Sequence, residues 1–116
     1  MRTVLLVDDD IDLLRSVAGL LRSRGYAVLE HSDPREALEC ASLNRELTFV
    51  LTDIDMPGMD GISLMNELRR IRPILQTVLM TGEPERWKTA GPERRYHLRK
   101  PFTSDELFRA IEHHST

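Results

Sequence analysis

Short apolar runs alternate with helical patterns along this chain, and this alternation limits the fold more than any other feature of the sequence. Each apolar run ends abruptly, which is typical of a strand buried on both faces of a parallel sheet. Each is followed by a stretch in which apolar residues recur at helical spacing. This strand-then-helix order predicts an α/β fold, an open parallel sheet with helices on both faces. The expected strands are Thr3–Val7, Tyr26–Leu29, Leu47–Thr52 and Ile74–Met80, with Arg95–Arg99 as a fifth, polar strand.

Capping residues mark where the helices begin. An Asp or Thr just before a helical pattern can accept hydrogen bonds from the free N–H groups of the first turn. The apolar faces of these helices include Leu20 on the first and Ile71 on the third, whereas Arg72 belongs to a charged face. The segment Glu83–Arg94 contains two prolines and little periodicity, so any helix there is short. The expected caps are Asp10, Asp33, Asp60 and Thr103.

The composition is that of one globular domain. A chain of 116 residues with 41% apolar and 30% charged residues can form one core. Its net charge of −3 provides no basic field, so we expect no direct nucleic acid binding and no membrane binding. No apolar run is long enough to span a bilayer, and Met1 leads straight into the first strand without a signal peptide. With Cys40 as the only cysteine, these features predict a cytoplasmic protein.

Polar side chains follow the predicted strands at one edge of the sheet. The first strand ends in Asp8 and Asp9, the third in Asp53, the fourth in Thr81 and the fifth in Lys100. Sites in open α/β sheets lie at the carboxyl ends of the strands, so we expect these side chains to converge. Two carboxylates ~4 Å apart repel by about 4 kcal/mol at an effective dielectric constant near 20. The cluster therefore needs a cation, and Mg²⁺ suits oxygen ligands.

Such a cluster suits transfer of a phosphoryl group to Asp53. A carboxylate can act as a nucleophile and form an acyl phosphate, while a metal ion, an ammonium and a hydroxyl contact the phosphoryl oxygens. Simpler interpretations exist for each residue. Asp10 is favoured as a helix cap, and Asp53 could begin the turn before Pro57. Thr81 or Lys100 alone would be uninformative, and their combination with the carboxylates supports the hypothesis.

Four motifs point to a family that this chain resembles. They are VLLVDDD at Val4–Asp10, LTDIDMPGMDG at Leu51–Gly61, MTG at Met80–Gly82 and KPF at Lys100–Phe102. In this order they resemble the receiver domain of two-component response regulators, the CheY-like family, over almost the whole chain. The resemblance implies a doubly wound, flavodoxin-like sheet of five parallel strands in the order 2-1-3-4-5, within a receiver domain over residues 1–116.

The resemblance also implies a role for each acidic residue. Asp53 takes a phosphoryl group from a phosphohistidine on a sensor histidine kinase or a histidine phosphotransfer protein. Asp9, Asp53 and the backbone carbonyl of Asp55 ligate Mg²⁺ (or Mn²⁺) directly, and Asp8 acts through metal-bound water. An output domain or a partner protein receives the signal. Asp55 and Glu83 flank the site, and we expect them to tune hydrolysis of the acyl phosphate.

The switching residues follow from the same resemblance. Lys100 pairs with the phosphoryl group, Thr81 moves toward it on activation, and the bond before Pro101 is usually cis. The family usually places Phe, Tyr or His three residues before the lysine, as a rotamer switch coupled to the threonine. That residue is His97 here, and Tyr96 could replace it only if the strand register shifted.

The spacing between Thr81 and Lys100 departs from the family's pattern. It is 19 positions, a few fewer than is common, and the missing residues fall in the fourth helix and the turn after it. We therefore expect a shortened fourth-helix region within Glu83–Arg94, which puts the family's usual output surface in doubt. Trp87, in this segment, either packs under the helix or is an exposed interaction residue.

Two other functions stay open at this point. An aspartyl-phosphate phosphohydrolase of the DxD type would use Asp53-Ile54-Asp55, but this chain lacks room for a cap domain. A receiver-like interaction module that has lost phosphorylation is the second alternative. The presence of every acidic and switching residue argues against it. We expect a signalling switch that catalyses its own phosphorylation and dephosphorylation, not a metabolic enzyme.

Overall fold

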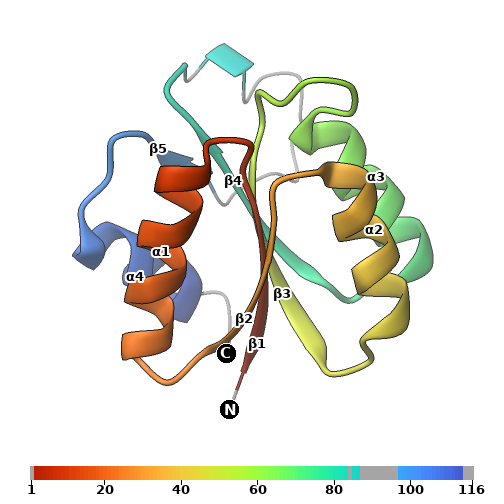
Figure 1. The fold of residues 1–116 in the computed structure, drawn as a ribbon, viewed down its shortest axis with the longest axis horizontal. Helices are drawn as coiled ribbons and strands as arrows, with labels where there is room; N and C mark the ends of the chain where they lie inside the picture. The colour runs from red at the N-terminus through yellow and green to blue at the C-terminus, as the bar shows by residue number, and fades with distance from the viewer. Residues whose placement is uncertain (1, 84, 87–96, 114–116) are drawn as a thin grey trace.

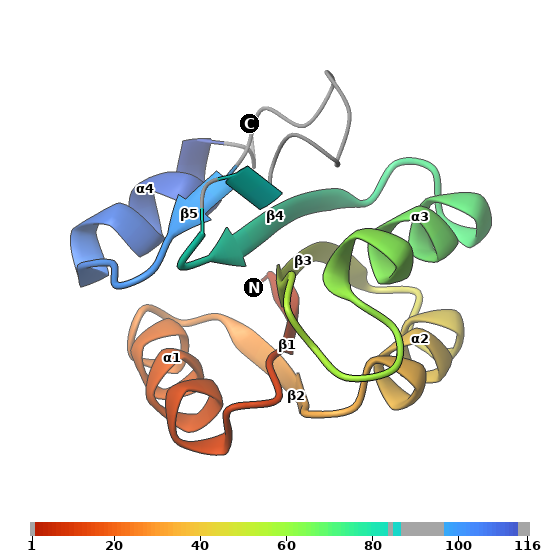
Figure 2. The same ribbon diagram turned by 90° about the horizontal axis from the view of Figure 1, so that it is seen from above.

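The protein has a doubly wound α/β fold, and its computed structural model describes residues 2–83, 85–86 and 97–113. The strands are β1 (Thr3–Val7), β2 (Ala27–His31), β3 (Leu47–Asp53), β4 (Gln76–Thr81) and β5 (His97–Arg99). The helices are α1 (Ile11–Ser23), α2 (Pro34–Leu43), α3 (Gly61–Ile71) and α4 (Ser104–His113). The described strands form a five-stranded parallel sheet in the predicted order β2-β1-β3-β4-β5. Figures 1 and 2 show α1 and α4 on one face of this sheet and α2 and α3 on the other.

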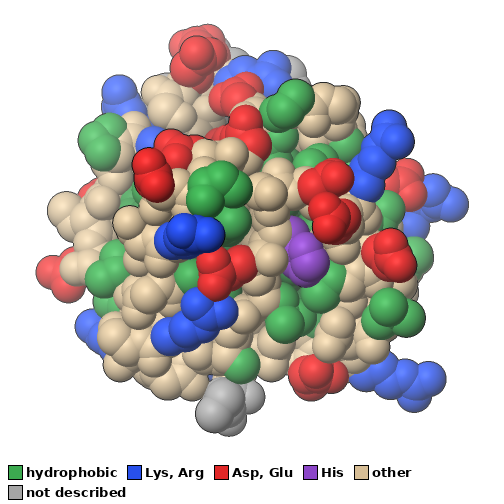
Figure 3. All heavy atoms as spheres, in the orientation of Figure 1, with side chains coloured by type: hydrophobic (Ala, Val, Ile, Leu, Met, Phe, Trp, Pro, Cys, Tyr) green, Lys and Arg blue, Asp and Glu red, His purple; other side chains and the backbone are tan. Residues whose placement is uncertain are grey.

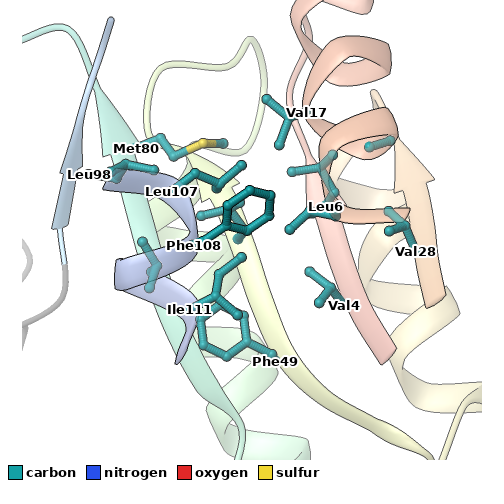
Figure 4. Packing of buried hydrophobic residues seen from close by; sticks show 14 of the residues in the cluster. Val4, Leu6, Val17, Val28, Phe49, Met80, Leu98, Leu107, Phe108 and Ile111 are labelled. Carbon is teal, nitrogen blue, oxygen red and sulfur yellow. The ribbon is translucent and has the colours of Figure 1, made fainter. Parts of the chain in front are cut away.

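Side chains of β1 alternate between two hydrophobic clusters. Val4 and Leu6 of β1 face the cluster beneath α1 and α4, whereas Leu5 and Val7 face the cluster beneath α2 and α3. Figure 4 shows the first cluster, in which Leu107, Phe108 and Ile111 of α4 point toward the sheet. Because both faces of β1 are covered, every position of the strand is apolar or buried, which explains its uninterrupted apolar run.

The predicted caps start the helices at the carboxyl edge of the sheet. Asp10 accepts a hydrogen bond from the backbone N–H of Leu13 at 3.2 Å, and Asp60 accepts one from Ser63 at 2.8 Å. Asp33 caps α2, and Thr103 exchanges hydrogen bonds with Glu106 before α4. These caps satisfy free N–H groups in the first turn of each helix at the carboxyl edge of the sheet.

Some predicted boundaries and faces were wrong. Strand β2 begins at Ala27 and runs to His31, and β4 begins at Gln76, because Ile74 lies in a turn with 91% of its surface exposed. Leu20 and Ile71 are 38% and 48% exposed, so they lie at the margins of the apolar faces to which they were assigned. A helical period marks a stripe wider than the part that a neighbouring sheet covers.

Arg72 was wrongly assigned to an ordinary charged face. Its guanidinium donates hydrogen bonds to the backbone carbonyls of Asn44, Arg45 and Leu47, the last two at 2.9 and 2.6 Å. Asn44 and Arg45 follow the end of α2, where helical hydrogen bonding stops, and Leu47 begins β3. Arg72 therefore fastens the end of α3 to the segment that leads into β3.

The predicted shortening of the fourth-helix region lies outside the described residues, as do Trp87 and Tyr96. Of Glu83–Arg94, the structure describes only residues 83, 85 and 86, the last two forming a single helical turn after β4. None of the helices within the described ranges is long and apolar enough to cross a bilayer.

Candidate functional site

Three carboxylates meet at the carboxyl edge of the sheet. Strands β1 and β3 are neighbours, with Val7 opposite Thr52, so the residues that follow them lie side by side. Asp8, Asp9 and Asp53 each place one oxygen within 4.8 Å of the others, as predicted. Asp8 and Asp53 are buried at 1% and 5% exposure, whereas Asp9 is exposed. In Figure 3, acidic side chains gather toward the top of the molecule, where the loops after these strands lie.

Lys100 joins the two buried carboxylates. Its ammonium lies 2.8 Å from Oδ2 of Asp8 and 3.1 Å from Oδ1 of Asp53. The backbone N–H of this lysine donates to the carbonyl of Thr81 at 2.8 Å, and the peptide bond to Pro101 is cis, as predicted. The second oxygen of Asp8 accepts the backbone N–H of Asp10 at 3.0 Å. The predicted convergence of Lys100 on the acidic cluster is therefore present.

Burial and like charges perturb the pKa of Asp53. The pKa of Asp53 is raised from 3.8 to about 6, mainly by desolvation and then by the nearby charge of Asp8, while Lys100 opposes both effects. Burial lowers the pKa of Lys100, but the carboxylates of Asp8 and Asp53 outweigh it and raise the pKa overall. The ammonium of Lys100 thus stays charged, whereas the site disfavours the ionised form of Asp53.

The donor set fits a hard divalent cation. Mg²⁺ is usually held by one or two carboxylates together with water and phosphate oxygens, and this cluster offers three carboxylates at one open edge. One lysine leaves the cluster with excess negative charge, which a divalent ion would balance. The predicted contribution of the backbone carbonyl of Asp55 stays a prediction, since only its side chain has described contacts.

Thr81 lies at the edge of the cluster and is fully buried. Its hydroxyl is 3.3 Å from Oδ2 of Asp55 and 3.4 Å from the backbone carbonyl of Glu83, and it accepts the N–H of Glu83 at 3.0 Å. The charged carboxylate is the stronger acceptor for the single hydroxyl proton. The Thr81 hydroxyl is therefore hydrogen bonded to Asp55, and not to a carboxylate of the acidic cluster.

His97 begins β5, where it is half-buried and pairs with Leu79 of β4. This register places it two positions along the strand from Arg99, which pairs with Thr81. Residues two positions apart on a strand point to the same face of the sheet, so His97 and Thr81 lie on the same face. This register is the one that a coupling between His97 and Thr81 requires. The role of His97 as a switch stays a prediction.

Two residues of the site were missed in the sequence. Gly61 begins α3 so close to β3 that a Cβ there would collide with the backbone carbonyl of Asp53, and only glycine fits. The motif that ends in Gly61 gave a signal for it. Arg86 forms ion pairs with Asp55 at 3.0 Å and with Asp60 at 3.7 Å. No periodicity marks the segment that carries Arg86.

Comparison with known proteins gives the same class as the geometry. A family model described as the response regulator receiver domain matches residues 4–112. The sensor kinase CckA of Brucella abortus is 39% identical over 84 residues, which cover 72% of this chain and 9% of that protein. The transcriptional regulatory protein PdtaR of Mycobacterium tuberculosis is 34% identical over 116 residues, 96% of this chain and 55% of that protein. The response regulator TrrA of Thermotoga maritima, solved in complex with Mg²⁺-BeF, has a TM-score of 0.87 at 26% identity and covers 97% of this chain and 98% of its own.

The chain therefore belongs to the response regulator receiver domain family, the phosphoacceptor module of two-component signal transduction. The predicted family and strand order are confirmed. The chain spans about half of PdtaR and a small part of CckA, and both relatives contain further sequence beyond the matched region.

Proposed function

We propose that this chain is a Mg²⁺-dependent switch that accepts a phosphoryl group on Asp53. The observation that carries the proposal is the contact of Lys100 with both buried carboxylates, at 2.8 Å from Asp8 and 3.1 Å from Asp53. This contact places an ammonium beside the oxygen that would be phosphorylated. After transfer, the same ammonium could pair with an oxygen of the phosphoryl group in place of the Asp53 carboxylate. We propose that residues 1–116 act as one receiver domain.

The transfer that we propose balances as a single displacement at phosphorus. A carboxylate oxygen of Asp53 attacks the phosphorus of a phosphohistidine, forming an O–P bond as the P–N bond breaks. The electron pair of the P–N bond goes to the imidazole nitrogen of the donor, which takes a proton from solvent. Asp53 must be ionised to attack, and its pKa of about 6 keeps most of it ionised at neutral pH.

A bound divalent cation and two side chains of this chain would stabilise the transferred phosphoryl group. Asp9, Asp53 and the backbone carbonyl of Asp55 would hold Mg²⁺ (or Mn²⁺) directly, with Asp8 acting through metal-bound water, and the ion would neutralise negative charge on the phosphoryl oxygens. Lys100 would move its hydrogen bond from the Asp53 carboxylate to a phosphoryl oxygen. Thr81 would rotate its hydroxyl from Asp55 to a second phosphoryl oxygen, and His97 would follow this change on the neighbouring strand.

The phosphodonor would be a sensor histidine kinase or a histidine phosphotransfer protein. A hollow of about 380 Å³ beside Lys100 supports docking of such a partner, since Leu13, Pro101 and Phe102 line it with apolar surface. Ile11, close by at the start of α1, is 45% exposed. A helix that carried the phosphohistidine could pack its apolar side here with the imidazole directed at Asp53. The signal would pass to an output domain or a partner protein, in the cytoplasm.

The alternatives have less support. Membership of the receiver family does not favour a DxD phosphohydrolase, because the chain aligns with signalling proteins over residues 4–112. A module without phosphorylation would not need a half-buried lysine between two buried aspartates. We therefore propose self-catalysed phosphorylation and slow dephosphorylation, with no metabolic substrate.

Intact mass after incubation with acetyl phosphate tests the proposal. The wild-type protein should gain one phosphoryl group in the presence of Mg²⁺ and none after chelation. Asp53→Asn should gain none, while Asp12→Asn, which removes an exposed aspartate from α1, should behave as wild type. No adduct and no consumption of acetyl phosphate by the wild-type protein would indicate the interaction module. Rapid consumption without adduct would indicate the phosphohydrolase.

A further inference from the structure

A second polar cluster lies on the outer side of the acidic site. It consists of Asp55 after β3, Thr81 at the end of β4, Arg86 in the turn after β4, and Asp60 at the start of α3. The two oxygens of Asp55 take different partners. Oδ2 accepts from the hydroxyl of Thr81 at 3.3 Å, and Oδ1 accepts from Nε of Arg86 at 3.0 Å.

Arg86 is held in this position from two sides. Its backbone N–H donates to the carbonyl of Glu83 at 2.9 Å, which closes the short turn after β4. Its guanidinium lies 3.7 Å from Oδ2 of Asp60, whose other oxygen caps α3 by accepting the N–H of Ser63. A planar guanidinium that contacts two carboxylates fixes their orientation more strictly than an ammonium would. Asp55 is thus fixed by Arg86 and presents its second oxygen to Thr81.

This chain of contacts opposes the movement that switching needs. Thr81 can donate its single hydroxyl proton to one acceptor at a time. While Arg86 holds Asp55 in place, that acceptor is the carboxylate of Asp55 and not a group on Asp53. A phosphoryl group on Asp53 must compete with Asp55 for the Thr81 hydroxyl.

We propose that Arg86 is a positioning residue that keeps the Thr81 hydroxyl on Asp55 in the unphosphorylated protein, so that loss of the Arg86–Asp55 contact favours the activated state. The proposal rests on the proposed function of Asp53 as phosphoacceptor. Thr81, Asp55 and Arg86 form a latch that phosphorylation opens. The latch sets the balance between the two states, whereas Lys100 and the acidic cluster carry the chemistry.

The expected effect is modest, because the latch lies partly in water. The side chains of Arg86 and Asp55 are 36% and 50% exposed. Ion pairs at such positions change an equilibrium by about two- to fivefold. An opposite role for Arg86 predicts the opposite sign. If Arg86 attracted the phosphoryl group through its positive charge, its removal would weaken binding of a phosphoryl analogue.

The first experiment measures the affinity of the site for beryllium fluoride in MgCl₂, followed by the methyl NMR signal of Thr81. Arg86→Gln should bind about two- to fivefold more tightly than wild type, since the analogue no longer competes with a fixed Asp55. Arg86→Lys, which keeps a cation able to pair with Asp55, should restore part of the wild-type affinity. Arg70→Gln should have no effect. It removes the same charge and breaks an exposed ion pair, with Glu67, on α3.

A double-variant cycle tests whether Arg86 acts through Asp55. In an Asp55→Asn background, Arg86→Gln should change the affinity by much less than it does in wild type, because the contact is already weakened. Equal effects in both backgrounds would overturn the proposed route. Unchanged or weaker binding by Arg86→Gln in the wild-type background would overturn the latch itself.

A second measurement needs neither metal nor phosphoryl analogue. Three-bond couplings to the methyl carbon of Thr81 report its χ1 rotamer in the metal-free protein. Wild type should populate mainly one rotamer, and Arg86→Gln should show averaging. An identical single rotamer in both proteins would refute the latch. Failure of the proposed function would give a different result, because the wild-type protein would then bind no beryllium fluoride. The three-bond couplings would still decide whether Arg86 orders the Thr81 side chain.

Discussion

Replacing Asp53 by asparagine is expected to stabilise the metal-free protein at neutral pH. The residue is 5% exposed and its carboxylate lies beside that of Asp8, so its negative charge is costly in the folded state. The rise of its pKa from 3.8 to about 6 corresponds to about 3 kcal/mol, at about 1.4 kcal/mol per pH unit. Water at the open edge of the site screens part of this cost, so we expect Asp53→Asn to gain about 1–2 kcal/mol.

The pH dependence of this gain gives a sharper test than its size. Because the pKa of Asp53 is higher in the folded than in the unfolded state, its contribution favours folding below pH 3.8 and is lost as the pH rises through about 6. The advantage of Asp53→Asn should therefore be full near neutral pH and shrink toward pH 4. Mg²⁺ should also reduce it, because the ion stabilises the wild-type site.

The assay is equilibrium unfolding in urea with EDTA, followed by circular dichroism, at about pH 7.5 and about pH 4.5. Asp105→Asn is the matched control, since it removes an exposed carboxylate from the first turn of α4. It should cost a few tenths of a kcal/mol, about 0.3, at neutral pH. An Asp53→Asn protein no more stable than wild type at neutral pH, or an advantage that persists unchanged in acid, would refute the reasoning.

Four further substitutions, one of them a control, test the packing of the fold and the charge of the site. Gly61→Ala should cost at least about 2 kcal/mol of unfolding free energy in the same assay, because the new methyl group meets backbone atoms of β3; Gly19→Ala, with open space around it in α1, should instead gain about 0.5–1 kcal/mol. Arg72→Met should cost about 1–3 kcal/mol, since backbone carbonyls before β3 lose their donors, and a neutral result would contradict this role. Lys100→Met should slow phosphoryl uptake from acetyl phosphate at least tenfold, about the effect of losing one charged donor, and uptake at the wild-type rate would exclude the lysine from the chemistry.

The fold could be predicted because its signals are local. Buried parallel strands give uninterrupted apolar runs. Asp10, Asp33 and Asp60 each cap a helix by accepting the N–H of a residue two or three positions later. The errors were at margins that tertiary packing decides. The exposed Ile74 resembles a strand residue in every local respect, yet it lies in the turn before β4.

The acidic cluster could be predicted for a topological reason. Parallel strands bring their carboxyl ends to one edge, so Asp8, Asp53 and Lys100 converge whatever the details of packing. The second cluster could not be predicted in this way. Arg86 pairs with Asp55 across 31 positions and lies in a turn without periodicity, so no sequence pattern links the two residues. Arg72 was misassigned for the same reason. Its partners are backbone carbonyls far away in the sequence, which only the folded chain brings to its guanidinium.

The central claim is that Asp53 carries the phosphoryl group, and chemical trapping tests it most directly. Borohydride reduces an aspartyl phosphate to homoserine, which marks the modified residue in a peptide digest. After incubation with acetyl phosphate and Mg²⁺, we expect homoserine at position 53 and at no other aspartate, and none when Mg²⁺ is chelated. Homoserine at position 8, 9 or 55, or its absence from a protein shown by intact mass to carry a phosphoryl group, would contradict the account.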